Sequence, residues 1–411
     1  MNRTVLFTAA HAHFPDTDPL GGGKAVADFL IRQSPHWQVL SPQTTGLTLP
    51  KPLAELSEWE YARFCRQFER VTTAAILQHD PAQCVVLTND ISEGPDFARL
   101  GKLGYRLVSI WHVDVVDYFC RMYLRNWVRP ERAARWSRYR WLPDVLQLVF
   151  HKQADCVRSS ARLIVPSAPM KDVILRCYPD CPPANMVVMP WGNLAGVKSE
   201  ASVREIGRDR PPGCPNQYAA RPAACPRFLI GVAPYPAEDE VVIMTLSRLS
   251  PEKGIERLIK ALRHLDTLNY RVWICGAPAF MQGQRYAAKL RRLAGDRVEF
   301  LGHVTGARKA ALLQRADLFV SASRHESYGL TIAEAAAAGC RIVSHQHYGA
   351  AGTVVDCSQP RELARVLTDL IRAGRTVKSP LEEPTNLVAE RLEAVLTSIV
   401  TMMCIFWTTV V

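Results

Sequence analysis

The chain has 411 residues, of which 48% are hydrophobic and 22% charged, and its net charge is +11. This is an ordinary globular composition, and the length excludes a single compact core but suits two domains. The positive charge makes the surface attractive to nucleotide diphosphates, nucleic acid and anionic lipid, and charge alone does not choose among these partners.

The amino terminus predicts a cytoplasmic protein. Its apolar run is broken by His11 and His13 and is too brief for the hydrophobic region of a secretory signal. The cysteines are scattered singly, and the closest pair, Cys177 and Cys181, has no companion pair to complete a metal site. We therefore expect buried, reduced thiols.

Short apolar runs rich in β-branched residues recur between helical patterns. In the first half they lie at 4–9, 84–88, 105–111, 162–167 and 185–190, and in the second at 240–247, 270–276, 297–302, 317–323, 341–344 and 353–356. Helical patterns in the second half cover 254–265, 284–293 and 331–338. Because the apolar runs are continuous rather than alternating, each half should be a parallel sheet with helices on both faces, which is an α/β, Rossmann-like architecture.

The predicted domains are 1–198 and 240–375. Residues 199–239 form a polar, basic stretch rich in proline, which indicates an interdomain linker or a surface insertion. A C-terminal extension, 376–411, ends in the uncharged tail 395–411. For this tail we favour a packed helix or strand over a segment that inserts into a membrane.

The segment His325–Glu334, HESYGLTIAE, carries two glutamates eight residues apart. On one helix they would be separated by roughly 80° and would not share a face, so we place Glu326 in a loop that precedes a helix. Gly329, Leu330 and Thr331 would then expose backbone N–H groups at a helix amino terminus, which binds phosphate. The glutamates could accept hydrogen bonds from sugar and ribose hydroxyls. The alternative is a solvated helix start with two incidental acids.

The segment SRLSPEKG follows the first apolar run of the second half and holds Arg248 and Lys253 on either side of a Ser-Pro turn. Open α/β sheets bind ligands at the carboxyl edge, where these cations and the Glu326 segment would meet. Two cations suit a diphosphate. For either residue alone an exposed cation on a loop would be the better interpretation, but the shared edge favours a functional site.

SRLSPEKGIERLIKAL and HESYGLTIAEAAAAG together resemble the donor-site motifs of the family 4 retaining glycosyltransferases. The resemblance implies the GT-B fold, in which two Rossmann-like domains face each other across a cleft. It also implies that Arg248 and Lys253 bind the nucleotide diphosphate, that Glu326 contacts the donor sugar and that Glu334 holds the ribose. The other predicted donor contacts in this half are Ser247, Gly329, Leu330 and Thr331.

The first half fits the family more loosely. Gly22 and Gly23, after the first apolar run, resemble the family's glycine loop, which lets backbone approach the donor diphosphate. The run is not a Walker loop, because Ala25 stands where Ser or Thr should bind magnesium. His112 matches a histidine that the family places beside the donor sugar, and a purely structural role is an equal alternative.

The segment 344–356 departs from the family, which usually has a loop of small residues there. His345 and His347 are unexpected, and no carboxylate or cysteine accompanies them at metal-ligand spacing. No Asp-x-Asp motif appears. We therefore predict no metal site, no divalent requirement and no cofactor.

Residues 121–141 hold seven arginines and a single acid, Glu131, with tyrosines and tryptophans between them. If the segment is helical apart from a break near Pro130, one cationic stripe that suits an anionic membrane or an anionic acceptor is formed by Arg121, Arg125, Arg129, Arg132 and Arg135. A solvated cationic face is the alternative. Nucleic-acid binding is not expected, because no RNA-binding motif accompanies the arginines.

The predicted function is retaining, metal-independent transfer of a hexosyl group from a nucleotide-diphosphate sugar to a hydroxyl of a glycan, a lipid-linked acceptor or a small molecule. The alternatives are a GT-B epimerase and a non-catalytic protein that binds sugar nucleotides or membranes. A dinucleotide-dependent oxidoreductase is disfavoured, because no G-x-G-x-x-G run follows a strand.

Overall fold

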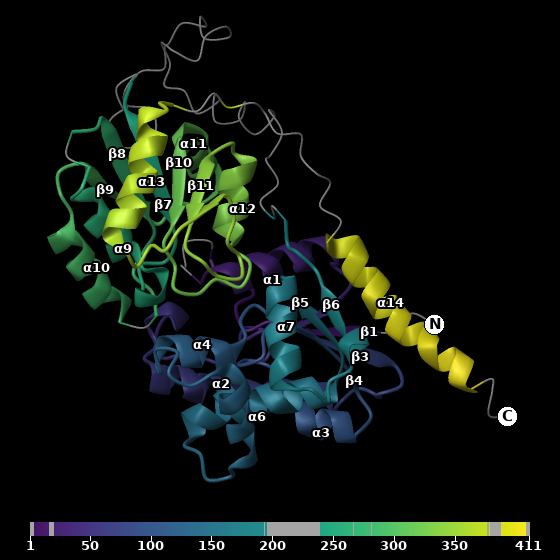
Figure 1. The fold of residues 1–411 in the computed structure, drawn as a ribbon. Coiled ribbons are helices and arrows are strands. Elements are labelled where there is room, and N and C mark those ends of the chain that lie inside the picture. Colours follow the sequence, from purple (N-terminus) through teal and green to yellow (C-terminus); the bar gives the residue numbers. More distant parts are fainter. Residues whose placement is uncertain are drawn as a thin grey trace, which may run out of the picture.

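The computed structural model describes residues 4–15, 20–192, 194, 239–265, 267–280, 282–375, 378 and 388–407. The predicted linker or insertion, 199–239, lies outside the described residues except for Asp239. The described chain forms two six-stranded parallel sheets with helices around them (Figure 1). The predicted α/β fold with two parallel sheets is confirmed.

The first sheet has the strand order β2-β1-β3-β4-β5-β6. Its strands are β1 (Thr4–Thr8), β2 (Gln38–Leu40), β3 (Cys84–Thr88), β4 (Arg106–Ile110), β5 (Ser160–Val165) and β6 (Met186–Val188). Its helices are α1 (Gly22–Gln33), α2 (Glu58–Ile76), α3 (Phe97–Lys102), α4 (Val115–Met122), α5 (Pro130–Ala133), α6 (Asp144–Ser159) and α7 (Ala168–Cys177). Every apolar run predicted in this half is a strand, and the short β2 was missed.

The second sheet has the strand order β12-β11-β10-β7-β8-β9. Its strands are β7 (Val241–Leu246), β8 (Tyr270–Cys275), β9 (Val298–Gly302), β10 (Leu318–Ser321), β11 (Arg341–Ser344) and β12 (Thr353–Val354). Its helices are α9 (Ile255–Leu262), α10 (Gly283–Leu293), α11 (Gly306–Arg315), α12 (Leu330–Ala337) and α13 (Pro360–Arg372). All the strands and helices predicted here are present, with ends shifted by a few residues.

Each sheet is buried on both faces, which explains the continuous apolar runs. In β4, Leu107 packs into the core on one face and Val108 into the core on the other. In β7, Ile243 and Met244 divide in the same way between two cores. Burying a side chain of this size contributes roughly 1.5–3 kcal/mol, so both faces stabilise the sheet.

In each sheet the order of successive strands changes direction at one strand, which is β1 in the first sheet and β7 in the second. β1 lies between β2 and β3, and β7 lies between β8 and β10. In an open parallel sheet the chain leaves a crevice at such a point, outside the carboxyl ends of the strands. The loops that follow β1, β7 and β10 begin at these crevices and carry most of the predicted site residues, and His112 follows β4, two strands from β1.

The C-terminal extension returns to the first sheet as α14 (Val388–Trp407), the long helix beside β1 and β6 in Figure 1. Leu392, Leu396 and Ile399 are buried in the same core as Phe7 of β1. The prediction of a packed C-terminal element is confirmed for this part of the tail. Within the described parts of the chain, none of the helices has both the length and the apolar character that a membrane crossing needs.

The prediction of one cationic stripe along 121–141 is wrong. The segment forms the end of α4, a loop, the four-residue α5 and a 3-10 helix at Ala134–Arg138. Arg125 and Asn126 have positive φ angles of 49° and 63°, which end the helical path after α4. The arginines therefore belong to several short elements and the loops between them rather than to one helix.

Gly254, between the turn that holds Lys253 and helix α9, offers a test of this fold. Its φ is +58°, and a side-chain carbon there would lie 2.4 Å from the carbonyl oxygen of Ala322. We expect Gly254→Ala to lower the free energy of unfolding by about 2 kcal/mol or more, through left-handed strain and a backbone clash.

The matched control is Gly295→Ala, at an exposed glycine where a side-chain carbon would meet nothing within 4 Å. Thermal and denaturant unfolding of both variants provide the measurement. Equal stability of the two variants would show that the turn at Gly254 is not built as described.

Candidate active site

The loops that follow β7 and β10 bring Lys253 and Glu326 together. Lys253 ends a 3-10 turn, Pro251–Lys253, and its Nζ donates to Glu326 Oε1 at 2.5 Å. Ser323 Oγ donates to the same oxygen at 3.0 Å. The sequence prediction that Glu326 precedes the helix is confirmed, because α12 begins at Leu330. An acid and a base that lie 73 residues apart in the sequence therefore form one pair at the sheet edge.

This pair determines the charge state of Glu326. Burial alone would raise the pKa of the carboxyl group, but the charge and the hydrogen bond of Lys253 outweigh it, with smaller contributions from His347 and Ser323. The pKa is lowered to about 2. Glu326 is therefore an ionised hydrogen-bond acceptor at neutral pH and not a proton donor.

Arg248 faces the first domain. Its guanidinium carbon lies 5.0 Å from the centre of the Phe280 ring, and its Nη2 is 3.4 Å from Glu252 Oε1. A side-chain carbon placed on Gly21 would lie 3.6 Å from the same guanidinium carbon. Arg248 thus stands against the glycine loop on the opposite side of the cleft.

The glycine loop and helix α12 meet at the same place. Gly21 has a φ of +83° and caps α1, whose first residues are Gly22 and Gly23. A side-chain carbon on Gly22 would lie 3.2 Å from Leu330 Cδ1. The absence of side chains here lets the amino terminus of α1 approach that of α12.

The amino terminus of α12 is capped by Gly329, whose φ is +81° and which has no side chain to bond the first N–H groups. Such a helix end attracts anions through its orphan donors and its dipole. Thr331 follows Leu330 in the first turn, and Glu334 lies one turn further on. Glu334 Oε1 accepts a hydrogen bond from Lys309 Nζ at 2.7 Å. The two glutamates therefore have different cationic partners.

Ser247 lies between β7 and Arg248. Its backbone N–H donates to the carbonyl of Cys275 at 3.0 Å, and its Oγ donates to the carbonyl of Arg248 at 3.2 Å. The hydroxyl thus holds the backbone of the residue that faces the glycine loop. Ser247 therefore lies directly after β7 and next to Arg248.

On the first domain His112 follows β4 and contacts the glycine loop through Asn89. Asn89 Nδ2 donates to the carbonyl of Gly23 at 2.9 Å, which leaves its Oδ1 to accept from His112 Nε2 at 3.1 Å. Burial lowers the pKa of His112 to about 4. The histidine is therefore neutral, with its proton on Nε2 and with Nδ1 as the acceptor nitrogen.

A second polar cluster on the first domain was missed by the sequence reasoning. His11 Nε2 lies 3.3 Å from Glu93 Oε1, and the Tyr61 hydroxyl donates to the same oxygen. Asp90 lies in the same loop as Glu93, and burial raises its pKa to about 6. The cluster adjoins the glycine loop, because a side-chain carbon on Gly23 would lie 3.2 Å from His11 Nδ1. No motif links residues from three separate elements, so the sequence carried no signal of the cluster.

The segment after β11 adds His347 and Tyr348 to the cleft. Both ring nitrogens of His347 are buried and have no hydrogen-bond partner among the described residues. Burial lowers the pKa of His347 to about 4, against the opposing charge of Glu326. His345 lies apart from the pair, where its Nδ1 accepts from the backbone N–H of Cys357 at 3.2 Å. The described residues hold no cluster of three metal-ligating side chains that could bind an ion.

Tyr348 and its neighbours also hold the two domains together. Arg121 of α4 donates to the Tyr348 hydroxyl at 3.3 Å and to Asp117 at 2.7 Å. The buried His325 lies 3.7 Å from the same Asp117 carboxylate. Arg121 is therefore part of the contact between the domains and not of an outer cationic stripe.

Comparison with known proteins assigns the second half. Residues 233–374 match the family model of glycosyl transferases group 1. An uncharacterized glycosyltransferase of Methanocaldococcus jannaschii is 34% identical over 110 residues, which are 26% of this chain and 27% of that protein. D-inositol 3-phosphate glycosyltransferase of Salinispora tropica is 30% identical over 172 residues, which are 36% of each protein. The chain thus matches only about a quarter to a third of the length of these curated relatives.

Solved structures resemble the whole chain. HepE of Anabaena in complex with UDP and glucose has a TM-score of 0.57 at 16% identity, over 90% of both chains. Sucrose-phosphate synthase of Thermosynechococcus elongatus has a TM-score of 0.58 at 15% identity, over 97% of this chain and all of that one. At these identities the likeness shows the fold, which is GT-B. Residues 233–374 therefore match a group 1 glycosyl transferase segment, which lies in the second domain of a GT-B fold.

Proposed function

We propose that the protein is a retaining glycosyltransferase that moves a hexosyl group from a nucleotide-diphosphate sugar to an acceptor hydroxyl without a metal ion. The observation that carries the proposal is the meeting of Arg248, the Lys253–Glu326 pair and the amino terminus of α12 at one sheet edge, opposite a glycine loop. This combination provides positive charge for a diphosphate and an ionised acceptor for sugar hydroxyls.

In this proposal the leaving diphosphate lies between Arg248, Lys253 and the first turn of α12. These groups stabilise the negative charge that develops as the bond to the sugar breaks, and electrostatic stabilisation of this kind usually accounts for most of the lowering of the barrier. The acceptor hydroxyl attacks the face from which the diphosphate leaves, and a phosphate oxygen takes its proton. With two side-chain cations present, no divalent ion is needed for charge neutralisation.

The hydroxyls of the donor have separate acceptors in this arrangement. Glu326 binds the sugar, Glu334 binds the ribose, and neutral His112 accepts from the sugar through Nδ1. Ser247 and the backbone of Gly22, Gly23, Gly329, Leu330 and Thr331 complete the proposed donor contacts. On the first domain the cluster of His11, Glu93 and Tyr61 lies next to the glycine loop and is placed to bind the acceptor.

Two alternatives remain distinct from this proposal. A GT-B epimerase would use the same donor edge without an acceptor, and a non-catalytic protein would bind the sugar nucleotide without turnover. The buried polar cluster on the first domain favours a transferase, because a second substrate needs polar groups on that side. A reducing, cytoplasmic setting is supported by the nine described cysteines, which are all buried free thiols.

Release of nucleoside diphosphate from a panel of UDP-, GDP- and ADP-sugars tests the donor site. We expect release from one donor class that is insensitive to EDTA. Arg248→Gln and Glu326→Gln should each lower the rate by roughly 10²–10³-fold, because each removes an interaction with the reacting groups.

Arg292→Gln, at an exposed cation on α10, is the matched control and should leave the rate unchanged. Product analysis separates transfer from epimerisation. If no donor is turned over and none raises the melting temperature, the catalytic proposal fails.

His347 predicts how the stability of the protein depends on pH. The pKa of His347 is near 4 when folded, below its ordinary value of 6.5, so the unfolded chain binds its proton first as the pH falls. This group therefore contributes stability that is present above about pH 6.5 and is lost as the pH falls toward 4.

His347→Gln removes this contribution, so the variant should gain stability relative to the wild type between pH 6.5 and 4. The difference between their free energies of unfolding, measured in urea at several pH values, provides the test. A difference that does not change with pH would show that His347 is not held neutral beside Glu326.

A further inference from the structure

The outer face of α2 carries a row of cations and one tryptophan that the proposed transfer reaction does not use. Trp59, Arg63, Arg66 and Arg70 recur at three- and four-residue spacing, so they share one face of the helix. They line a shallow groove of about 500 Å³ together with Ala62, Gln67, Asp144 and Val145. The groove thus lies between α2 and the start of α6.

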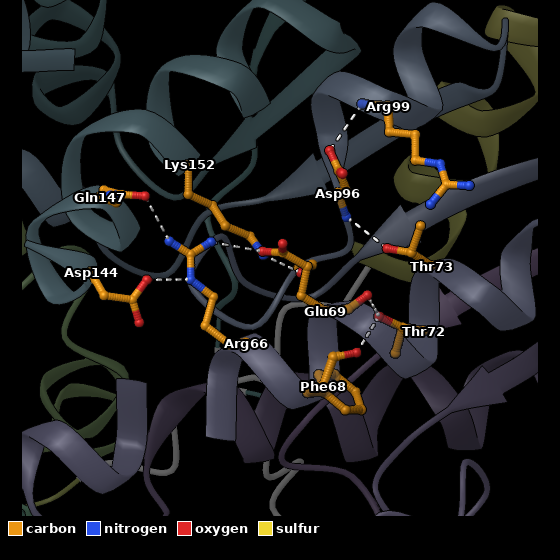
Figure 2. Close-up of polar contacts among 11 residues, drawn as sticks. Arg66, Phe68, Glu69, Thr72, Thr73, Asp96, Arg99, Asp144, Gln147 and Lys152 are labelled. Atoms are coloured by element: carbon orange, nitrogen blue, oxygen red, sulfur yellow. Dashed lines mark hydrogen bonds and ion pairs between the residues drawn. The ribbon is translucent and has the colours of Figure 1, made fainter. Parts of the chain in front are cut away.

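The cations of the groove differ in their partners. Arg66 donates to Asp144 at 2.9 Å and lies 3.5 Å from Glu69, which also pairs with Lys152 (Figure 2). Its charge is therefore largely neutralised. Arg63 and Arg70 are exposed and form no ion pair with any residue that the structure describes. These two arginines give the groove its free positive charge.

Exposed aromatic side chains lie in the groove and in the segment that leads into α6. Trp59 is 68% exposed, and Trp141 is 77% exposed three residues before Asp144. Tyr139 is 50% exposed, and its ring lies 5.8 Å from that of Trp141. Gln147 connects the two parts, because it receives a hydrogen bond from Arg66 and donates to the carbonyl of Leu142.

Large aromatic side chains at this exposure indicate a surface that binds a partner. Tryptophan and tyrosine have amphipathic rings that are enriched at the level of lipid headgroups, where one end is apolar and the other wet. Unpaired arginines attract anionic lipid, and Arg138 and Arg140 alternate with Tyr139 and Trp141 as further exposed cations. Exposed rings and free cations in the groove and in the segment before α6 match the headgroup region of an anionic bilayer.

We infer that this arginine–tryptophan face, defined by Trp59, Arg63, Arg70, Tyr139 and Trp141, binds the surface of an anionic lipid bilayer. Arg63 and Arg70 contact headgroup phosphates, while the aromatic rings enter the interfacial layer. The face replaces the single helical stripe that the sequence suggested along 121–141, and it adds residues of α2 that carried no signal. The inference does not depend on the proposed transfer reaction.

Sedimentation with lipid vesicles tests the inference on the full chain. Vesicles of phosphatidylcholine alone are compared with vesicles that also contain phosphatidylglycerol, at low and high salt. We expect binding to the anionic vesicles only, weakened by salt, with a blue shift of tryptophan fluorescence. Arg63→Gln with Arg70→Gln should weaken binding about 25-fold, taking roughly fivefold for each arginine.

Trp59→Ala with Trp141→Ala should also weaken binding and remove most of the blue shift. The matched control is Lys289→Gln with Arg292→Gln, two exposed cations of α10 on the second domain, which should bind like the wild type. Circular dichroism and the melting temperature establish that each variant is folded.

Three results would overturn the inference. The first is a wild type that binds neither kind of vesicle, or binds both equally. The second is a control pair that weakens binding as much as the arginine pair, which would indicate net charge rather than this face. The third is tight binding of single-stranded nucleic acid through Arg63 and Arg70 without binding to vesicles.

Discussion

The guanidinium of Arg248 lies beside Gly21, 3.6 Å from the position that a side-chain carbon there would take, which is an ordinary contact distance. This contact brings the carboxyl edges of two separate sheets within reach of one small ligand. Gly22 likewise leaves room for the side chain of Leu330 at the start of α12, because a side-chain carbon on Gly22 would crowd it. If either glycine carried a bulky side chain, the two helix amino termini would move apart, and the cations of the second domain would no longer face the loop of the first.

Each of the two glutamates at the edge of the second sheet has a lysine partner. The Lys253–Glu326 pair keeps the buried carboxylate ionised, and Lys309 supplies the matching positive charge for Glu334 from another helix. An unpaired carboxylate at such a depth would raise its pKa and take up a proton, which would turn an acceptor of hydroxyl groups into a donor. Beside them His112 and His347 stay neutral because they are buried. The cleft therefore combines fixed charges with uncharged, proton-accepting rings.

The strands were predictable from sequence because each is buried on both faces and reads as a continuous apolar run, whereas β2 has only three residues. The meeting of Lys253 with Glu326 was predictable because the two residues lie in short segments that follow strands of one parallel sheet. The cluster around Glu93 was not, since it joins loops that only the folded sheet brings together. The helix expected along 121–141 failed at Arg125 and Asn126, whose left-handed backbone no spacing rule reveals. The exposure of Trp59 could not be predicted from the sequence either, because a tryptophan on an amphipathic helix is more often buried.

Helix α14 makes the folding of the first domain depend on a segment that follows the second domain in the sequence. The last described helix packs on the first sheet, where Leu392 and Leu396 join the core that contains Phe7. The polypeptide therefore passes from one domain to the other twice, and the first domain is completed only when α14 has been made. During synthesis an apolar face of the first domain therefore stays uncovered until the ribosome has made the whole second domain and α14. A truncated chain that ended after β6 would keep that face exposed and would be expected to aggregate.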